Sequence, residues 1–102
     1  MNKVGKSDLT ISEISLGCWT LGGLNWVDGS PNGWANVNEP EVEEAINYAI
    51  DNGVTHFDNA DVYGNGRAER MLSKILGSRT KEVTIATKIG WFKGTAAHAY
   101  EP

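Results

Sequence analysis

The sequence predicts an α/β domain built around a parallel sheet. Two observations indicate this class: short β-prone segments alternate with amphipathic helical segments, and their order along the chain is strand, helix, strand, helix, strand. Parallel neighbours need a crossover segment, which is usually a helix, so this order favours a parallel sheet with right-handed connections. With 102 residues, the chain has room for one small domain.

A short hairpin and the first strand of the sheet are expected at the start of the chain. Ser7 and Asp8 are turn formers, and we expect them to turn the hairpin. The segment ISLG, residues 14–17, follows as the first strand.

A long segment rich in Gly, Asn and Trp runs from Trp19 to Val37 and is expected to be a loop. Loops of this length are uncommon unless they bind a ligand or are disordered. Trp19, Trp26 and Trp34 lie in it. They either cover an end of the fold or form a wall of a substrate pocket, and the sequence leaves both interpretations open.

The first helix is expected within residues 37–53. Asn38 suits the N-cap, Glu41 stands three residues later, and Pro40 lies in the first turn, where its missing N–H costs nothing. Gly53 suits a left-handed helix end. The apolar residues recur at helical spacing: Val42, Ala45, Ile46, Ala49 and Ile50.

The same order of elements then repeats. The segment VTHFD, residues 54–58, reads as the second strand. The segment GRAERMLSKILG, residues 66–77, reads as the second helix and ends at Gly77. The segment KEVTIATK, residues 81–88, reads as the third strand. One face of the second helix is apolar: Ala68, Met71, Leu72, Ile75 and Leu76.

Polar side chains are expected to meet at the carboxyl edge of this sheet, where ligands bind in parallel α/β folds. Asp58 ends the second strand, Tyr63 lies in the following loop, and Lys88 ends the third strand. Side chains alternate along a strand, so Lys88 shares a face with Thr84 and Asp58 shares a face with His56, while the apolar residues of the third strand face the helices. Asp58 and Lys88 therefore converge.

Asp58, Tyr63 and Lys88 would form a proton-transfer set. A free phenol, with a pKa of about 10, is a poor acid at neutral pH, but an adjacent ammonium stabilises the phenolate and lowers the pKa of a phenol. Asp58 would hold Lys88 in position and keep it charged. The alternative is a structural Asp58–Lys88 pair with Tyr63 as a packed surface aromatic, and the spacing alone does not decide between them.

Several segments, in the right order, resemble the aldo-keto reductases. GVTHFDNADVYG is similar to the segment that carries the catalytic Asp and Tyr of that family, with five positions from Asp58 to Tyr63. VTIATK resembles the segment with the family's lysine, and SEISLGCWTLGG resembles its first barrel strand and the loop after it. The likeness runs from the N-terminal hairpin to the end of the chain. Asn59 stands where Thr or Ser is usual, a change that we expect to be tolerated.

This resemblance implies an NADP-dependent carbonyl reductase or alcohol dehydrogenase on a (β/α)8 TIM-type barrel. A nicotinamide would transfer hydride to a carbonyl carbon while Tyr63, supported by Lys88 and Asp58, donates a proton to the oxygen of the aldehyde or ketone. The residues implied for cofactor binding are Cys18, partly through its backbone, Trp19 and Asp58, and those implied for substrate binding are Trp19 and Trp91.

A full barrel of this type needs about 250 residues. Residues 1–102 would therefore supply about the first three of its eight units, an incomplete domain from the N-terminal part of an aldo-keto reductase. The family's catalytic histidine, at the end of the fourth strand, and its phosphate-gripping segments would fall outside the chain, and His98 is better explained as a loop residue.

Three parallel strands cannot close, so their open edges invite self-association. We therefore expect the isolated chain to be inactive on its own. The alternative function is a non-catalytic half-barrel remnant, or a regulatory subunit that pairs with another chain.

Composition and charge exclude several other classes. The net charge is −4, without a basic patch, so no nucleic-acid partner is expected. No apolar run is long enough to span a membrane, and the N-terminus lacks the apolar core of a signal peptide. Cys18 is the only cysteine, so we expect a soluble protein of the reducing cytoplasm.

Two weaker patterns do not indicate a ligand site. The histidines and Asp58 and Asp61 lack ligand spacing on one helix or turn, so no metal site is expected. The segment GNGRAE lacks the G-x-G-x-x-G spacing of a phosphate loop and is interpreted as the start of a helix.

Overall fold

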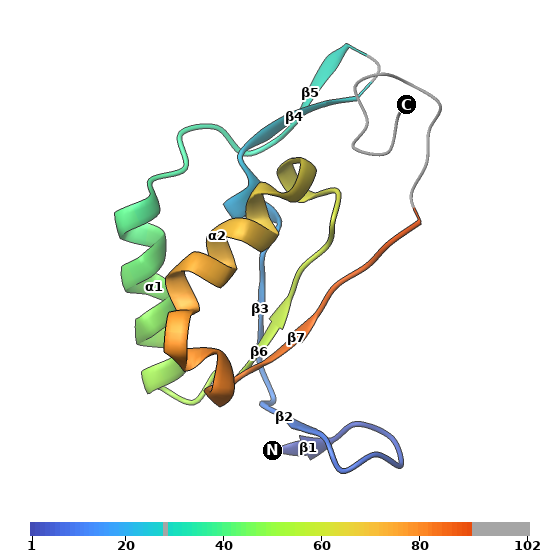
Figure 1. The fold of residues 1–102 in the computed structure, drawn as a ribbon, viewed down its shortest axis with the longest axis vertical. Coiled ribbons are helices and arrows are strands. Elements are labelled where there is room, and N and C mark those ends of the chain that lie inside the picture. The colour runs from blue at the N-terminus through green and yellow to red at the C-terminus, as the bar shows by residue number, and fades with distance from the viewer. Residues whose placement is uncertain (28, 91–102) are drawn as a thin grey trace.

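The computed structural model describes residues 1–27 and 29–90, which form a parallel sheet with both α-helices on one side (Figure 1). The sheet order is β3–β6–β7, and each neighbouring pair is parallel. Its strands are β3 (Ser15–Gly17), β6 (His56–Asp58) and β7 (Thr84–Ala86). Helix α1 (Glu39–Asp51) connects β3 to β6, and α2 (Arg67–Leu76) connects β6 to β7. The predicted parallel sheet with helical crossovers is therefore confirmed.

The register of the sheet separates a helix-facing side from an open side. His56 pairs with Thr84 and Phe57 pairs with Ile85 in the parallel ladder. Phe57 is fully buried against the helices, whereas His56 Nδ1 and Thr84 Oγ1 lie 2.6 Å apart on the other face. Because successive side chains of a strand point to opposite faces, Asp58 projects from the side of His56. No α-helix of the described residues covers that side.

Helix α1 begins and ends where the sequence predicts. The backbone N–H of Glu41 donates to Asn38 Oδ1 at 3.2 Å, as expected for an N-cap. Gly53, with φ of +96°, follows the helix in the left-handed region. The predicted apolar face is correct at Ile46 and Ile50, which are buried, but wrong at Ala45, which is exposed. The helix therefore makes contact through a narrower stripe than the sequence pattern indicates.

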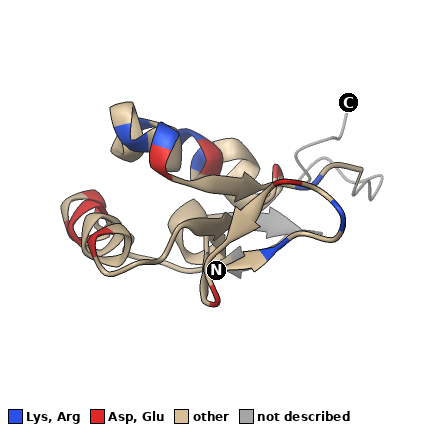
Figure 2. Ribbon diagram, turned by 90° about the horizontal axis from the view of Figure 1, so that it is seen from below, with Lys and Arg blue, Asp and Glu red and all other residues tan. Residues whose placement is uncertain are grey.

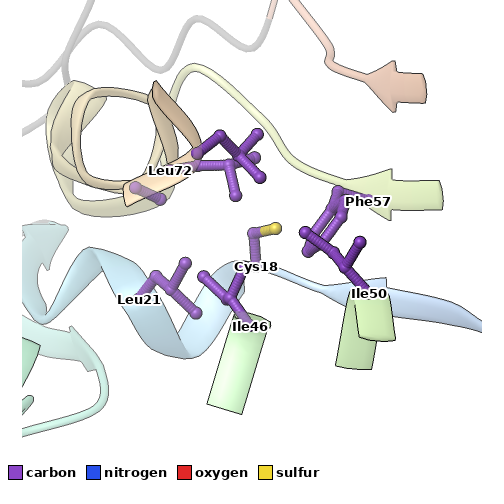
Figure 3. Packing of buried hydrophobic residues seen from close by; sticks show 8 residues of the cluster. Cys18, Leu21, Ile46, Ile50, Phe57 and Leu72 are labelled. Atoms are coloured by element: carbon purple, nitrogen blue, oxygen red, sulfur yellow. The ribbon is translucent and has the colours of Figure 1, made fainter. Parts of the chain in front are cut away.

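A single core joins the helices to the sheet (Figure 3). Helix α2 contributes the buried face that the sequence predicts, and Phe57 of β6 packs against it. The eight buried members of this cluster are Cys18, Leu21, Ile46, Ile50, Phe57, Ala68, Leu72 and Leu76. Full burial of one large apolar side chain contributes about 1.5–3 kcal/mol, so this cluster is the main source of stability in the described part of the chain.

Charge complementarity links the two helices at their exposed edges (Figure 2). Helix α1 contains acidic residues and no Lys or Arg, whereas α2 and the 3-10 helix η3 (Gly77–Glu82) contain cations. Lys74 Nζ lies 3.0 Å from Glu39 Oε2, and Arg79 Nη2 lies 2.8 Å from Asp51 Oδ1. Exposed ion pairs contribute little free energy, so these pairs orient the helices more than they stabilise them.

The segment from Trp19 to Val37 is more ordered than predicted. It contains a 3-10 helix, η1 (Trp19–Gly22), and an antiparallel hairpin of β4 (Leu24–Val27) and β5 (Ser30–Gly33). The expectation of a loop without elements was therefore wrong. Strand β5 has the sequence SPNG and contains no apolar alternation, and β4, LNWV, is only four residues long, so periodicity could not reveal the hairpin.

The third strand is also shorter than predicted. Lys81 and Glu82 belong to η3, not to β7. The Thr80 hydroxyl donates to the Gly77 carbonyl at 2.5 Å, and Arg79 Nε donates to Glu82 Oε2 at 2.9 Å. These local hydrogen bonds favour a turn over an extended conformation.

The predicted N-terminal hairpin is present at the opposite end of the sheet from β4 and β5 (Figure 1). It consists of β1 (Asn2–Lys3) and β2 (Thr10–Ile11), and its turn is closed by a hydrogen bond from the Val4 N–H to the Leu9 carbonyl at 2.8 Å. Among the described helices, none combines the length and the apolar character that crossing a bilayer requires.

Candidate active site

Asp58, Tyr63 and Lys88 come together at the carboxyl edge of the parallel sheet. Lys88 Nζ donates to Asp58 Oδ1 at 2.7 Å and to the carbonyl oxygen of Asn59 at 2.6 Å. It lies 3.5 Å from the Tyr63 hydroxyl and 5.2 Å from the centre of the Tyr63 ring. The convergence predicted from strand parity is thus what the structure contains. The Asn59 carbonyl was not predicted, because backbone acceptors leave no mark in a sequence.

Backbone pairing beyond the regular strands holds this cluster together. The N–H of Asn59 donates to the Ala86 carbonyl at 2.8 Å, and the N–H of Asp61 donates to the Lys88 carbonyl at 3.2 Å. On the other side, the N–H of Cys18 donates to the Asp58 carbonyl at 2.9 Å. The ends of all three strands are therefore tied together at the site, which fixes where each side chain starts.

Asp58 stabilises the positive charge of Lys88. The hydrogen bond to Asp58 raises the pKa of Lys88 above its ordinary value, burial opposes this shift, and the contact with Tyr63 adds to it. Lys88 therefore keeps its positive charge throughout the neutral range. The side chains of Asp58 and Lys88 are 51% and 52% exposed, so the pair is open to a ligand from the uncovered face of the sheet.

Tyr63 is placed by a close contact between two glycine backbones. It begins the 3-10 helix η2 (Tyr63–Gly66), which leads into α2. A Cβ atom added to Gly22 would lie 2.7 Å from both the Gly64 nitrogen and the Tyr63 carbonyl carbon, closer than real Cβ contacts occur. The loop after β3 and the loop after β6 can therefore touch here only because Gly22 has no side chain.

Gly22→Ala tests this contact. We expect it to lower the free energy of unfolding by about 1–3 kcal/mol, because the added methyl group must displace backbone that carries Tyr63. Gly17→Ala is the matched control, since a Cβ atom there meets nothing within 4 Å. Chemical denaturation of both variants measures the difference. Equal stability of the two variants would contradict the steric role of Gly22.

Arg67 joins these loops to α2, and no sequence pattern predicted this role. Its Nε donates to the Gly22 carbonyl at 2.7 Å, and its Nη2 donates to the Leu24 carbonyl. One side chain thus holds η1 and the start of the β4–β5 hairpin against the first residue of α2. The start of a helix predicted for GNGRAE is confirmed at this position.

The residues expected to contact a cofactor or substrate differ in their exposure to solvent. The Cys18 side chain is fully buried in the core, so only its backbone could meet a ligand. Trp19 and Trp34 are both exposed and contact each other edge-to-face, with ring centres 6.1 Å apart. Trp91 and His98 lie outside the described residues, as does the Trp26 side chain.

Burial should also make Cys18 unreactive. It raises the pKa of the Cys18 thiol to about 11 from 9.0, with the charge of Asp58 adding to this rise and that of Lys88 opposing it. At pH 8 the thiolate fraction is then lower by about 100-fold than in the unfolded chain, and we expect alkylation to slow by at least that factor. Iodoacetamide labelling followed by mass spectrometry, in buffer and in denaturant, measures the ratio. Equal labelling rates would show that the thiol is accessible.

Among the described residues, no group of three or more His, Cys, Asp or Glu side chains has an arrangement that could hold a metal ion. His56 instead contacts Thr84, and Asp58 contacts Lys88. These side chains have partners that account for their positions.

Known proteins share both the sequence and the fold. The sequence profile of the Aldo/keto reductase family matches residues 13–101. A probable voltage-gated potassium channel subunit beta of Arabidopsis thaliana is 37% identical over 94 residues, which cover 86% of this chain and 24% of that protein. The uncharacterized oxidoreductase YqkF of Bacillus subtilis is 30% identical over 102 residues, which cover 98% of this chain and 29% of that protein.

A solved structure extends the likeness to three dimensions. The holo form of an aldo-keto reductase from Bacillus halodurans superposes with a TM-score of 0.72 at 24% identity, covering 98% of this chain and 30% of that one. This likeness shows a shared fold of the TIM-barrel type. The chain spans between about a quarter and a third of the length of these proteins. On the family match over most of its length, the chain belongs to the Aldo/keto reductase family.

Proposed function

We propose that this chain supplies the proton-transfer residues of a nicotinamide-dependent oxidoreductase that reduces aldehydes or ketones to alcohols. The observation that carries the proposal is the position of one ammonium group. Lys88 Nζ is held by Asp58 at 2.7 Å and lies 3.5 Å from the Tyr63 hydroxyl. Membership of the Aldo/keto reductase family supports an oxidoreductase.

Tyr63 is the proton donor in this proposal. Its hydroxyl would donate to the carbonyl oxygen of the substrate as negative charge develops on that oxygen. The phenolate left behind would be stabilised by the ammonium of Lys88, because opposite charges at this separation attract strongly at a partly desolvated site. Asp58 would keep Lys88 charged and aimed at the phenol. Trp19 and, beyond the described residues, Trp91 would border the substrate.

The residues present fit the reacting end of a nicotinamide cofactor. Asp58 and Lys88 are half-exposed on the sheet face that no described α-helix covers, so a flat ring can approach them. A bound reduced nicotinamide supplies the hydride. The backbone of Cys18, together with Trp19 and Asp58, would contact it. NADPH is the form that the family resemblance implies, and its phosphates would need segments beyond the three strands of the parallel sheet.

Completion of the sheet is part of the proposal. The edge strands β3 and β7 each have one unpaired side among the described residues. Unpaired strand edges bind further strands, so we propose that additional strands, from the same polypeptide or from a second copy, close the site into a barrel. Size-exclusion chromatography of the 102-residue chain would reveal pairing between copies as a dimer.

An assay of nicotinamide consumption tests the function. NADPH and NADH are offered separately, with a panel of aliphatic and aromatic aldehydes and ketones, to the protein that the complete reading frame encodes. We expect consumption that requires a carbonyl substrate and is faster with NADPH. Consumption of neither cofactor with any carbonyl compound would overturn the proposal, while faster turnover with NADH would overturn only the NADP preference.

A second candidate function is a regulatory subunit, and one relative favours it. The Arabidopsis thaliana protein at 37% identity bears the name of a channel subunit. A regulatory role would use the same fold to pair with another chain without reducing a substrate. Binding of NADPH without any turnover, measured as a change in tryptophan fluorescence, would favour this candidate. Turnover that depends on Tyr63 would favour the enzyme.

A further inference from the structure

Asn59 connects the interior of the fold to the proton-transfer site. It follows β6 and is 1% exposed. Its side chain lines a groove of about 160 Å³ between α2 and β7, together with Leu72 and Ile85. Its carbonyl oxygen, by contrast, accepts a hydrogen bond from Lys88 Nζ at 2.6 Å. The residue therefore has its side chain on the helix side and its carbonyl group at the site.

The side chain of Asn59 secures the turn that directs this carbonyl. Its Oδ1 accepts a hydrogen bond from the N–H of Ala60 at 2.9 Å, and Ala60 is itself buried. The Asn59 N–H donates to the Ala86 carbonyl at 2.8 Å, which ties the same residue to β7. The peptide groups on both sides of Asn59 are thus held, and the direction of its carbonyl group is set by these bonds.

Lys88 needs this carbonyl in order to face Tyr63. A lysine ammonium has three donors on a flexible stem. Two of them are taken by Asp58 Oδ1 at 2.7 Å and by the Asn59 carbonyl at 2.6 Å, and these two bonds direct the ammonium toward the Tyr63 hydroxyl at 3.5 Å. With Asp58 as its only close partner, the half-exposed ammonium could rotate around that carboxylate and leave the phenol.

We propose that Asn59 is a positioning residue, whose amide side chain locks the turn after β6 so that its own carbonyl holds Lys88 beside Tyr63. The placement of Lys88 stands on the geometry alone. Its consequence for the rate of carbonyl reduction rests on the proposed function.

The amide side chain of Asn59 also contains a buried donor without a partner in the described part of the chain, and this unfavourable feature argues against a purely structural role. Asn59 Nδ2 is buried without a hydrogen-bond partner among the described residues. An unpaired buried donor is unfavourable, so a purely structural position would be served better by an apolar side chain of the same size. Asn59→Leu removes the unpaired donor and keeps the number and branching of the side-chain heavy atoms, but it also removes the acceptor for the Ala60 N–H. It therefore separates packing from positioning.

The test uses three Asn59 variants of the protein encoded by the complete reading frame. We expect Asn59→Leu to keep its thermal stability, because the loss of the unpaired Nδ2 donor offsets the loss of the acceptor for the Ala60 N–H. We expect kcat to fall about tenfold at unchanged KM, because the loss of one hydrogen bond to a charged group has about this effect. Asn59→Ser retains an acceptor, and we expect it to recover most of the rate. Asn59→Ala is interpreted in the same way as Asn59→Leu if leucine prevents folding. Ser73→Ala, which alters the same groove, is the matched control.

Nuclear magnetic resonance of lysine-labelled protein gives a readout that needs no activity. The Lys88 signal is identified by its absence in Lys88→Arg, and we expect its ammonium protons to exchange with water severalfold faster in Asn59→Leu. An unchanged Lys88 signal in both Asn59→Leu and Asn59→Ala would overturn the proposal. A changed Lys88 signal in a protein that reduces no carbonyl compound would support the placement and overturn the reductase function instead.

Discussion

Replacing Tyr63 by phenylalanine is expected to lower the rate of carbonyl reduction by about 10²–10⁴-fold, the usual contribution of a positioned general acid. The substitution removes only the hydroxyl oxygen, which lies 3.5 Å from Lys88 Nζ, and leaves the ring in contact with the core. The free energy of unfolding should therefore change little. In the proposed mechanism no other described hydroxyl replaces the lost donor.

The measurement is kcat with NADPH and the best aldehyde of the panel, together with thermal denaturation. Tyr48→Phe is the matched control, because Tyr48 is an exposed residue of α1 and loses the same hydroxyl. Equal turnover by Tyr63→Phe and the unmodified protein would remove Tyr63 from the role of proton donor. If turnover is retained in Tyr48→Phe but lost in Tyr63→Phe, the loss is specific to the hydroxyl of Tyr63.

Replacing Lys88 by methionine is expected to lower kcat by about 10²–10³-fold, the effect of losing one group that stabilises a developing anion. Methionine has a similar length without the charge, so the phenolate of Tyr63 would lose its stabilising partner. Asp58 would also be left without its cation. Carbonyl reduction and the pH dependence of kcat, measured side by side, test this expectation.

The pH dependence follows from the direction of the Lys88 pKa. This pKa is raised, chiefly by the hydrogen bond to Asp58, so the stabilisation that the charged pair gives is complete below the ordinary lysine pKa of about 10.4. It is lost as the pH rises through the higher value of the folded protein. Lys88 therefore adds no step to the pH profile between pH 6 and about 9. A Lys74→Met control changes an exposed lysine of α2, and a loss of activity equal to that of Lys88→Met would contradict a specific role.

The sequence predicted the features that depend on the alternation of side chains along a strand and on the residues that begin and end helices. Strand parity placed Asp58 and Lys88 on one face, and their 2.7 Å contact agrees with it. The caps of α1 and α2 were readable because Asn38, Gly53 and Gly77 have conformational or hydrogen-bonding preferences of their own. Such signals act within a few residues of the chain, so they can be recognised without knowing the tertiary contacts.

What the sequence did not predict depends on long-range backbone contacts. The Gly22–Gly64 contact and the hydrogen bonds of Arg67 join segments more than 40 positions apart, and no local pattern encodes them. The β4–β5 hairpin was not predicted, for a different reason. Its residues pair through their backbones, so their side chains need not alternate. Ala45 was misassigned because periodicity gives the width of a face only approximately.

The backbone contact at Gly22 and Gly64 has a consequence for how this scaffold can diversify. Neither loop can grow where their main chains touch without pushing Tyr63 away, so length changes at that point should be selected against. Gly29, in the connection between β4 and β5, is exposed, and a Cβ atom there would meet nothing within 4 Å. Exposed loop tips tolerate insertions, so this connection could lengthen while the arrangement of Asp58, Tyr63 and Lys88 is inherited intact.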